Sequence, residues 1–185
     1  MKRMRSSHAA LDESSRIKKA AKIVAVLKDF CYLPDCQVLD IGTGSGYIAH
    51  ALSKEFKKIV SINLSDERVI RDGYEFQIIQ DEHLPFQDES FDVVISNHVI
   101  EHTLNQRLHV EEIYRVLKKD GVFYLATPNK YAIMEPHFKL PLLGWFPRGI
   151  TKAYLHIVKR KVWDVYLLSY GQIRDLLKKI LSVMI

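Results

Sequence analysis

The feature that most constrains the fold is a glycine-rich turn between an apolar run and an amphipathic segment. Residues 38–47 read VLDIGTGSGY, and an acidic side chain, Asp40, stands two residues before the first glycine. Glycine adopts backbone angles that other residues avoid, and it lets a ligand approach the main chain closely. Such a turn at the carboxyl end of a parallel strand, followed by the free N–H groups of a helix start, is typical of a cofactor site.

The spacing of these glycines excludes two common nucleotide-binding turns. The dinucleotide fingerprint is G-x-G-x-x-G, whereas Gly42, Gly44 and Gly46 stand at every second position. A P-loop requires Gly-Lys-Ser/Thr, and here Tyr47 follows the last glycine. The alternative interpretation is an ordinary tight turn from strand to helix, so the motifs further along the chain decide between the two.

Apolar runs alternate with helical periodicities along the middle of the chain. We expect strands at 37–41, 58–62, 76–79, 91–95 and 122–126, helices at 46–55 and 105–118, and a helical turn at 66–71. The strands are short and almost wholly apolar, which suits a parallel sheet covered on both faces. We therefore predict an α/β fold with a three-layer, doubly wound, mostly parallel sheet, in one domain spanning 1–185.

The two ends of the chain differ from this pattern. In the segment 1–33, Ser14 or Ser15 is expected to cap a helix that ends near Phe30. The apolar residues of that helix repeat at spacings of three and four, and its predicted inward side consists of Ile17, Ala20, Ala21, Val24 and Leu27.

The segment 130–168 is predicted to be an insertion that recognises the substrate. Its first part, 130–150, is rich in proline and aromatic residues and is expected to be irregular, with a helix at 151–167 after it. A last helix starts after Ser169, which has capping-box spacing to Gln172.

The charge of the chain is unevenly distributed around a net value of +5. Residues 1–30 contain 8 Lys/Arg and 3 Asp/Glu, residues 128–185 contain 10 and 3, and residues 31–127 contain 9 and 16. Basic ends favour an anionic substrate or surface near the termini, and solvated helix faces are the alternative. Cys31 and Cys36 form no zinc motif, so we expect free thiols. The basic N-terminal segment lacks an apolar core, so we expect no signal peptide and a cytoplasmic location.

Further motifs follow the predicted strands in order. Asn63 ends the second strand; DEHLPFQDESFD at 81–92 follows the third, SNHVIEH at 96–102 follows the fourth, and LKKDGVF and TPN begin at 117 and 127. Together with the D-x-G-x-G-x-G turn, these motifs resemble the class I S-adenosylmethionine (SAM)-dependent methyltransferases, in the type 11 group. The resemblance covers roughly 35–129. It implies a Rossmann-like fold, SAM as cofactor and S-adenosylhomocysteine as product.

The resemblance also implies which residues bind the cofactor. They are Asp40, Gly42, Thr43, Gly44, Gly46, Asn63, Leu64, Asp81, Glu82, His83 and Asn97. Family members usually have Asp or Glu at the position of Asn63, where a carboxylate accepts hydrogen bonds from the ribose hydroxyls. An amide there keeps an acceptor and adds a donor but loses the charge, at a cost of about 1–2 kcal/mol.

Methyl transfer to a hydroxyl group requires a base, and histidine is suited to this because its ordinary pKa lies near neutrality. We predict His98 or His137 as the catalytic base. Glu101 and His102 either organise their loop or take part in catalysis, and with no second close pair of ligands we predict no metal site.

The predicted function is methyl transfer from SAM to a small-molecule or a lipid- or glycan-linked acceptor, at a hydroxyl oxygen. The segment 131–148 is apolar with basic residues, which fits an amphipathic and possibly anionic acceptor. A nucleic-acid methyltransferase is disfavoured because no N/D-P-P-Y motif follows the fourth strand. A non-catalytic module of the same fold is the other alternative.

The sequence after the last predicted helix has room for one short strand at most, where the family's sheet has two more. The C-terminal strands are therefore expected to be missing or shortened, which leaves the fifth strand as an open edge. We predict that a homodimer contact or the terminal helix covers this edge. No transmembrane segment is expected.

Overall fold

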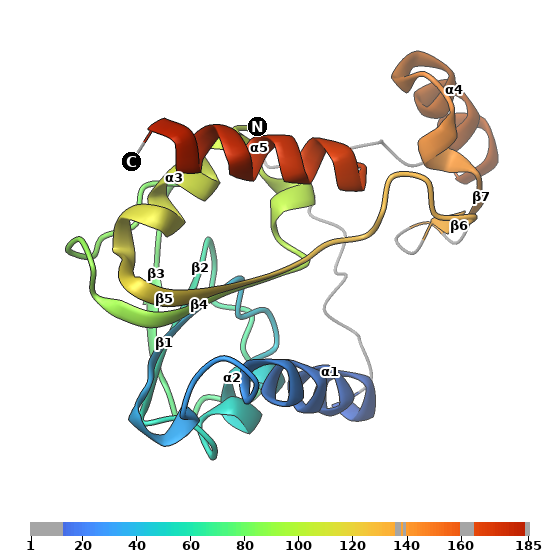
Figure 1. Cartoon of the computed structure of the whole chain (residues 1–185). Coiled ribbons are helices and arrows are strands. Elements are labelled where there is room, and N and C mark those ends of the chain that lie inside the picture. Colours follow the sequence, from blue (N-terminus) through green and yellow to red (C-terminus); the bar gives the residue numbers. More distant parts are fainter. Residues whose placement is uncertain (1–12, 136–137, 139, 160–164, 184–185) are drawn as a thin grey trace. The chain divides into compact units, whose positions relative to one another are not determined.

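The computed structural model describes residues 13–135, 138, 140–159 and 165–183 (Figure 1). They belong to two compact units. The first consists of Met1–Ser96 with Glu112–Leu125, and the second of Asn97–Glu111 with Ala126–Ile185. No helix in the described part of the chain is long and apolar enough to span a bilayer.

A five-stranded sheet forms the first unit, with the strand order β3-β2-β1-β4-β5. Its strands are β1 (Gln37–Ile41), β2 (Lys58–Asn63), β3 (Glu75–Ile78), β4 (Phe91–Asn97) and β5 (Leu117–Ala126). β1 is parallel to β2 and to β4, and β2 is parallel to β3. The predicted α/β class with a mostly parallel sheet is confirmed.

The register places the ends of three strands side by side. Ile41, the last residue of β1, pairs with Ile62 on one side and with Ser96 on the other. The chain first runs outward through β2 and β3 and then returns to the opposite side of β1. Such a reversal of strand order is where ligands bind in open α/β sheets, outside the carboxyl ends of the strands.

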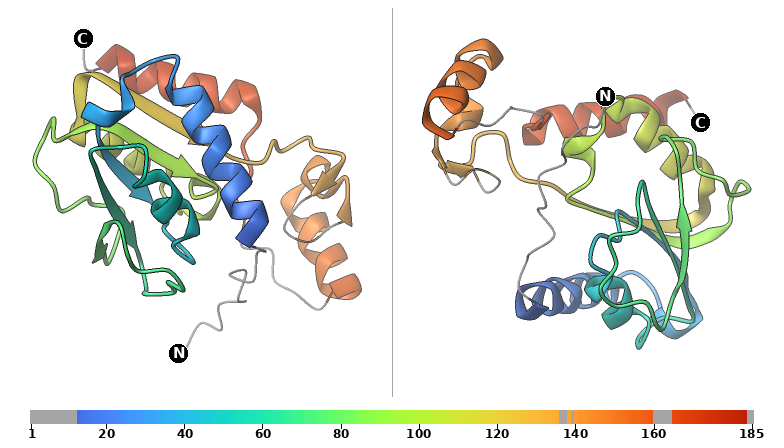
Figure 2. Two further views of the ribbon diagram at one scale, coloured as in Figure 1. Left: turned by 90° about the horizontal axis from the view of Figure 1, so that it is seen from below. Right: turned by 180° about the vertical axis from the view of Figure 1, so that it is seen from behind.

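Helices α1 (Glu13–Leu27) and α2 (Tyr47–Leu52) cover one face of this sheet (Figures 1 and 2). The short 3-10 helix η1 (Leu33–Asp35) leads from α1 into β1. The core between helices and sheet consists of Ala20, Ile23, Leu27, Leu33, Cys36, Val38, Ile48, Ala49, Leu52, Phe56, Ile59, Val93 and Ile95. Burial of each large side chain contributes about 1.5–3 kcal/mol.

The inward face of α1 differs from the prediction. Ala20 and Leu27 are buried as expected, but Ile17 and Ala21 are exposed and Ile23 is buried instead. The capping prediction was wrong as well, since α1 already includes Glu13, so that both serines lie within the helix. The buried face of α1 therefore follows the spacing of Ala20, Ile23 and Leu27, about one residue away from the predicted apolar stripe.

The predicted helical turn at 66–71 is absent. The N–H groups of Val69 and Ile70 both donate to the carbonyl oxygen of Ser45, at 2.9 and 3.2 Å, instead of to carbonyls of their own turn. Asp66 is held by the guanidinium of Arg68, whose Nε donates to it at 2.9 Å. These contacts tie an extended segment to the glycine turn.

Helix α3 (Gln106–Val116) ends earlier than predicted. The carbonyl oxygens of Arg115 and Val116 accept hydrogen bonds from the N–H groups of Glu89 and Ser90, at 2.9 and 2.8 Å. These oxygens are therefore not available to continue the helix, and the predicted C-cap at Asp120–Gly121 lies inside β5.

The second unit contains the predicted insertion, which is more regular than expected. Within the insertion there is a hairpin of β6 (Met134–Glu135) and β7 (Leu140–Pro141), followed by the 3-10 helix η3 (Leu143–Trp145) and the helix α4 (Arg148–Lys159). The second unit also contains the 3-10 helix η2 (Ile100–His102) and the helix α5 (Tyr170–Val183). Phe138, Leu143, Leu155 and Val165 form a small core of their own. The predicted helix at 151–167 instead begins at 148, and 165–169 are not helical.

The capping box before α5 is confirmed. The N–H of Ser169 donates to Oε1 of Gln172 at 2.9 Å, and the N–H of Gln172 donates to Oγ of Ser169 at 3.3 Å. Two backbone donors at the helix start are thereby satisfied reciprocally, which fixes where α5 begins.

Candidate functional site

The three glycines of the turn after β1 all have a left-handed backbone, with φ of 85° at Gly42, 53° at Gly44 and 85° at Gly46. A Cβ on Gly46 would overlap the carbonyl oxygen of Ile70 and the hydroxyl of Tyr74. A Cβ on Gly44 would meet only the carbonyl oxygen of Gly42, at 3.9 Å. Gly46 is therefore required by the fold itself, whereas Gly44 leaves its main chain open to a ligand.

The turn is fixed to the end of β2 by three hydrogen bonds. The carbonyl oxygen of Ile62 accepts from the N–H groups of Gly42 and Thr43, at 2.9 and 3.2 Å, and from Oγ1 of Thr43 at 3.2 Å. The side chain of Thr43 is buried. It therefore positions the turn rather than presenting its hydroxyl to solvent.

The acidic residue before the turn, Asp40, is buried and accepts a hydrogen bond from Oγ of Ser61 at 2.7 Å. Burial raises the pKa of Asp40 to about 6, and the Ser61 hydrogen bond and the charge of Arg16 oppose this rise. A buried carboxyl with such a pKa changes its charge near neutral pH, which makes it sensitive to any cation that binds beside it.

Arg16 is a candidate site residue that the sequence analysis missed. Its charge acts on Asp40 from α1, and burial lowers the pKa of Arg16. Its buried Nε has no acceptor within the described ranges. A signal was present in the sequence, because residue 16 continues the spacing of Ala20, Ile23 and Leu27, which are the buried positions of α1.

Asn63 lies at the end of β2, and its Nδ2 donates to the carbonyl oxygen of Ser65 at 2.9 Å. One N–H of this amide is thus used within the chain, and its Oδ1 is available to accept from a ligand hydroxyl. Leu64, the next residue, is exposed.

The predicted loop after β3 is exposed at Asp81, whose Oδ1 accepts from the N–H of His83 at 2.8 Å. This bond closes a local turn that includes Glu82. The second carboxylate oxygen of Asp81 remains for a ligand such as an amino group.

Two residues of α3 that the sequence analysis did not single out hold the next part of this loop. Oε2 of Glu112 accepts from the N–H of Leu84 at 2.9 Å. The guanidinium of Arg115 donates to the carbonyl oxygens of Leu84 and Phe86, both at 2.8 Å, and pairs with Glu112 and Asp88. The i, i+3 spacing of Glu112 and Arg115 was the only sequence pattern that indicated their ion pair.

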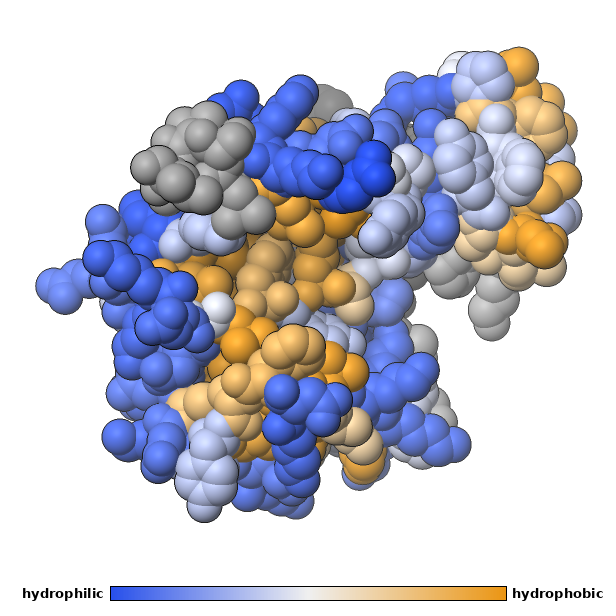
Figure 3. Space-filling view, viewed as in Figure 1, coloured by the Kyte–Doolittle hydropathy of each residue, from blue (hydrophilic) through white to orange (hydrophobic). Residues whose placement is uncertain are grey.

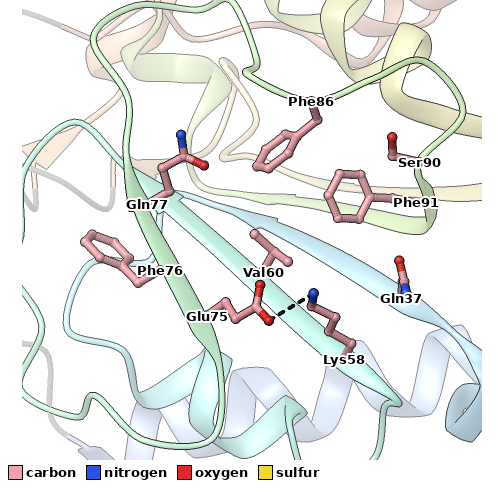
Figure 4. Close-up of a pocket in the computed structure, with 9 residues that line it drawn as sticks. All are labelled: Gln37, Lys58, Val60, Glu75, Phe76, Gln77, Phe86, Ser90 and Phe91. Carbon is pink, nitrogen blue, oxygen red and sulfur yellow. Dashed lines mark ion pairs between the residues drawn. The ribbon is translucent and has the colours of Figure 1, made fainter.

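A hollow on the first unit lies at the amino ends of the strands, opposite the glycine turn (Figure 4). Gln37, Lys58, Glu75 and Phe91, which line it, are the first residues of β1, β2, β3 and β4. An ion pair of 2.9 Å joins Lys58 and Glu75 there. Because open α/β sheets bind ligands at the carboxyl ends of their strands, we do not assign the cofactor to this hollow.

In the second unit, His98 and Glu101 form a pair. Nδ1 of His98 lies 3.3 Å from Oε1 of Glu101, whose side chain is 0% exposed. Oε2 of Glu101 accepts from Oγ1 of Thr127 at 2.8 Å. Burial alone would raise the pKa of Glu101, but hydrogen bonds from His98, its own backbone and Thr127 together hold it below the usual value.

The backbone around this pair is held on several sides. His98 has a φ of 59°, a conformation rare for a residue with a side chain, and its N–H donates to the carbonyl oxygen of Ala126 at 2.7 Å. The carbonyl oxygen of Glu101 accepts from the N–H of Tyr166 at 2.7 Å. Such over-determined strain is common at functional sites.

The remaining predicted residues of this unit differ in what the structure shows. Asn97 has a buried Nδ2 without an acceptor in the part of the chain that is described. His102 is exposed. His137 lies outside the described residues. The described residues contain no group of three or more His, Cys, Asp or Glu arranged to hold a metal ion.

We expect Asp40→Asn to stabilise the protein at neutral pH. The folded pKa of about 6 exceeds the ordinary 3.8, so the contribution of Asp40 is most favourable below pH 4 and is lost as the pH rises through 6. The gain in free energy of unfolding should therefore grow from near zero at pH 4 to about 3 kcal/mol above pH 7.

Urea unfolding of both proteins from pH 4 to 8 measures this difference. His109 contributes in the opposite sense, because burial lowers its pKa to about 4. Both proteins contain His109, so it cancels when the two are compared. A difference that does not change with pH would contradict the assignment to Asp40.

Comparison with known proteins gives matches to methyltransferases. A family model described as a methyltransferase domain matches residues 39–125. Over 123 residues the chain is 31% identical to a probable S-adenosylmethionine-dependent methyltransferase of Mycolicibacterium smegmatis, covering 64% of this chain and 48% of that protein. Over 130 residues it is 26% identical to a ubiquinone biosynthesis O-methyltransferase of Parvibaculum lavamentivorans, covering 62% and 50%.

The fold is also similar to solved structures. The crystal structure of an S-adenosylmethionine-dependent methyltransferase from Mesorhizobium loti superposes with a TM-score of 0.65 at 15% identity, covering 89% of this chain and 82% of that chain. The chain spans about half the length of the curated relatives it matches.

Proposed function

Because the chain belongs to the class I SAM-dependent methyltransferases, in the type 11 group, we propose that the protein transfers a methyl group from SAM to the hydroxyl oxygen of a small-molecule or a lipid- or glycan-linked acceptor. The observation that carries the choice of a hydroxyl acceptor is the pairing of His98 with the buried Glu101.

The residues of the first unit suit the cofactor of this family. Gly44 leaves the turn open, and Arg16 has a buried donor without an acceptor in the described residues. We propose that Arg16 binds the α-carboxylate of the methionine part and that the Asp40 carboxylate lies beside its amino group. Oδ1 of Asn63 would accept from the ribose, and Asp81 would accept from the adenine amino group.

When bound, SAM supplies an electrophilic methyl group on a sulfonium. The chain's own contribution is to hold and deprotonate the acceptor. With Nδ1 of His98 held by Oε1 of Glu101, the other ring nitrogen, Nε2, keeps its lone pair and takes the hydroxyl proton. The Glu101 carboxylate then stabilises the imidazolium.

The acceptor class rests on two further observations. The relative from Parvibaculum lavamentivorans is named as an O-methyltransferase of ubiquinone biosynthesis. The segment 130–168 contains 7 Lys/Arg and 2 Asp/Glu among many apolar residues. We propose that this segment recognises the acceptor, and that an amphipathic acceptor with an anionic group suits it best.

Calorimetric titration with SAM and S-adenosylhomocysteine tests the cofactor site. We expect binding by the parent chain and none by Gly44→Val, whose side chain would occupy the open face of the turn. Arg16→Gln removes the charge and should weaken binding by about tenfold or more, since a charge-assisted hydrogen bond contributes about 1.5–3 kcal/mol.

Each outcome separates the alternatives. Binding that Gly44→Val abolishes, followed by release of S-adenosylhomocysteine with a hydroxylated acceptor, supports the proposal. Binding without turnover on any hydroxylated acceptor would favour a non-catalytic module. No binding by the parent chain would contradict the assigned cofactor site, make Asn63 the first residue to test, and favour a non-catalytic role.

A further inference from the structure

The second unit exposes a continuous apolar surface, which we call the α4 face: Leu142, Phe146, Ile150, Tyr154 and Ile157. The first four of these residues line one groove, together with Pro141. Ile157, at the far end, is 78% exposed. Figure 3 shows hydrophobic residues in orange on this helix. A surface of this kind on a soluble protein usually marks a contact with a partner or a membrane.

Helix α4 is apolar on two sides rather than one. Thr151 and Leu155 are buried and face the unit's own core. Ile150, Tyr154 and Ile157 follow the spacing i, i+4, i+7 and therefore form a second stripe along the helix. Tyr154 packs in part against the unit's own core, whereas Ile150 and Ile157 are 56% and 78% exposed and are available for another contact.

Two aromatic side chains lie on the segment that leads into α4. The rings of Tyr131 and Trp145 are in edge-to-face contact, with centroids 5.5 Å apart, and Nε1 of Trp145 donates to the carbonyl oxygen of Tyr131 at 3.1 Å. Both are about half exposed. Half-exposed Trp and Tyr, apolar at one end and polar at the other, are characteristic of residues at a bilayer interface.

The polar side of α4 carries only basic groups. Lys152, His156 and Lys159 are exposed, and the helix contains no acidic residue. Within the described ranges neither lysine pairs with a carboxylate. Lys130 is also basic and lies with Nζ 5.5 Å from the centre of the Tyr131 ring. The second unit thus exposes apolar, aromatic and basic groups in and near α4.

We propose that the α4 face binds the surface of an anionic lipid membrane, with α4 lying in the plane of the interface. A helix with an apolar stripe and a basic polar side has the composition of interfacial helices, which bind by burying apolar area and by attraction to anionic headgroups.

Vesicle flotation of the whole chain tests this inference independently of methyl transfer. We use vesicles of phosphatidylcholine alone and of phosphatidylcholine with phosphatidylglycerol. The protein should float with the anionic vesicles and not with the neutral ones. Addition of 0.5 M NaCl should release most of it, because the Debye length then falls to about 3–4 Å and the attraction to the headgroups is screened.

Three variants make the test specific. Ile157→Asp should weaken binding to anionic vesicles by about tenfold or more, because it puts a charge in the exposed stripe. Lys152→Gln with Lys159→Gln should also weaken this binding, because it removes two positive charges. Phe30→Asp is the matched control, since Phe30 is also exposed, at 67%, but belongs to the first unit, and it should bind as the parent does.

Fluorescence gives a second readout of the same contact. The chain has two tryptophans, so Trp163→Phe leaves Trp145 as the only one. Its emission should shift to shorter wavelength with anionic vesicles and not with neutral ones. Absence of flotation and of this shift would overturn the proposal. So would a mass of two chains that Ile157→Asp reduces to one without any vesicle binding, because a second copy would then cover the face.

Discussion

Replacing His98 with glycine is expected to lower the turnover number by about 10²–10⁴-fold, which is the usual contribution of a general base. The main chain should tolerate this change, because His98 has a φ of 59°, which glycine adopts without strain. The pair with Glu101 is lost together with the imidazole. SAM affinity should stay within about twofold, since no cofactor contact is assigned to this ring.

Release of S-adenosylhomocysteine in the presence of the acceptor measures this loss. Free imidazole added to the His98→Gly protein should restore part of the rate, because it can occupy the space of the missing ring and accept the proton. A purely structural role for His98 would give no such rescue. Full activity of the variant would instead exclude His98 and leave His137 as the candidate base.

The second large effect is on stability. Gly46→Ala should lower the free energy of unfolding by about 2–5 kcal/mol, because the left-handed backbone disfavours any Cβ and this Cβ would overlap the carbonyl oxygen of Ile70. Gly44→Ala has the same backbone strain but open space around its Cβ, so its cost should be only about 1–2 kcal/mol.

Urea unfolding of the two alanine variants separates these terms, and each serves as the control of the other. Their difference reports the steric overlap at Gly46 alone, since both residues have positive φ. Equal losses in the two variants would mean that the turn adapts around Gly46, and would contradict the close packing against Ile70 and Tyr74.

Strands β1 and β4 were predictable because their apolar runs are buried in the sheet, whereas β3, at its edge, is mostly exposed. Val38, Leu39, Val93 and Val94 are all fully buried, so their uninterrupted hydrophobic sequence reflects the environment directly. The end of α3 was not predictable, because it depends on hydrogen bonds from Glu89 and Ser90, which lie far from it in the sequence. Tertiary contacts of this kind have no local pattern.

The residues of the candidate site were likewise predictable only in part. The spacing of glycines and Asp40 indicated the turn, since the required backbone geometry admits few other residues. The partner of Glu101 was not evident, because the adjacent His102 and the more distant His98 were both available in the sequence. Only the left-handed backbone at His98 brings its ring to within 3.3 Å of the carboxylate.

Arg16 shows a third kind of limit. Its position continues the buried spacing of α1, but a charged residue on such a face is normally taken as the edge of the apolar stripe. The compensating group, Asp40, belongs to a different element and carries the opposite charge. A buried carboxyl and a partly buried guanidinium are each uncommon alone, and their opposite charges explain why both occur here.

The central place of β1 in the sheet also bears on dynamics. Both of its neighbours hold it by hydrogen bonds, and Val38 and Leu39 have no exposed surface, so its amide hydrogens should be among the slowest to exchange with solvent. The glycine turn extends directly from this slowly exchanging strand. The open backbone at Gly44 is therefore ordered when the chain folds, and under the proposed function SAM would lose little affinity to the ordering of that backbone.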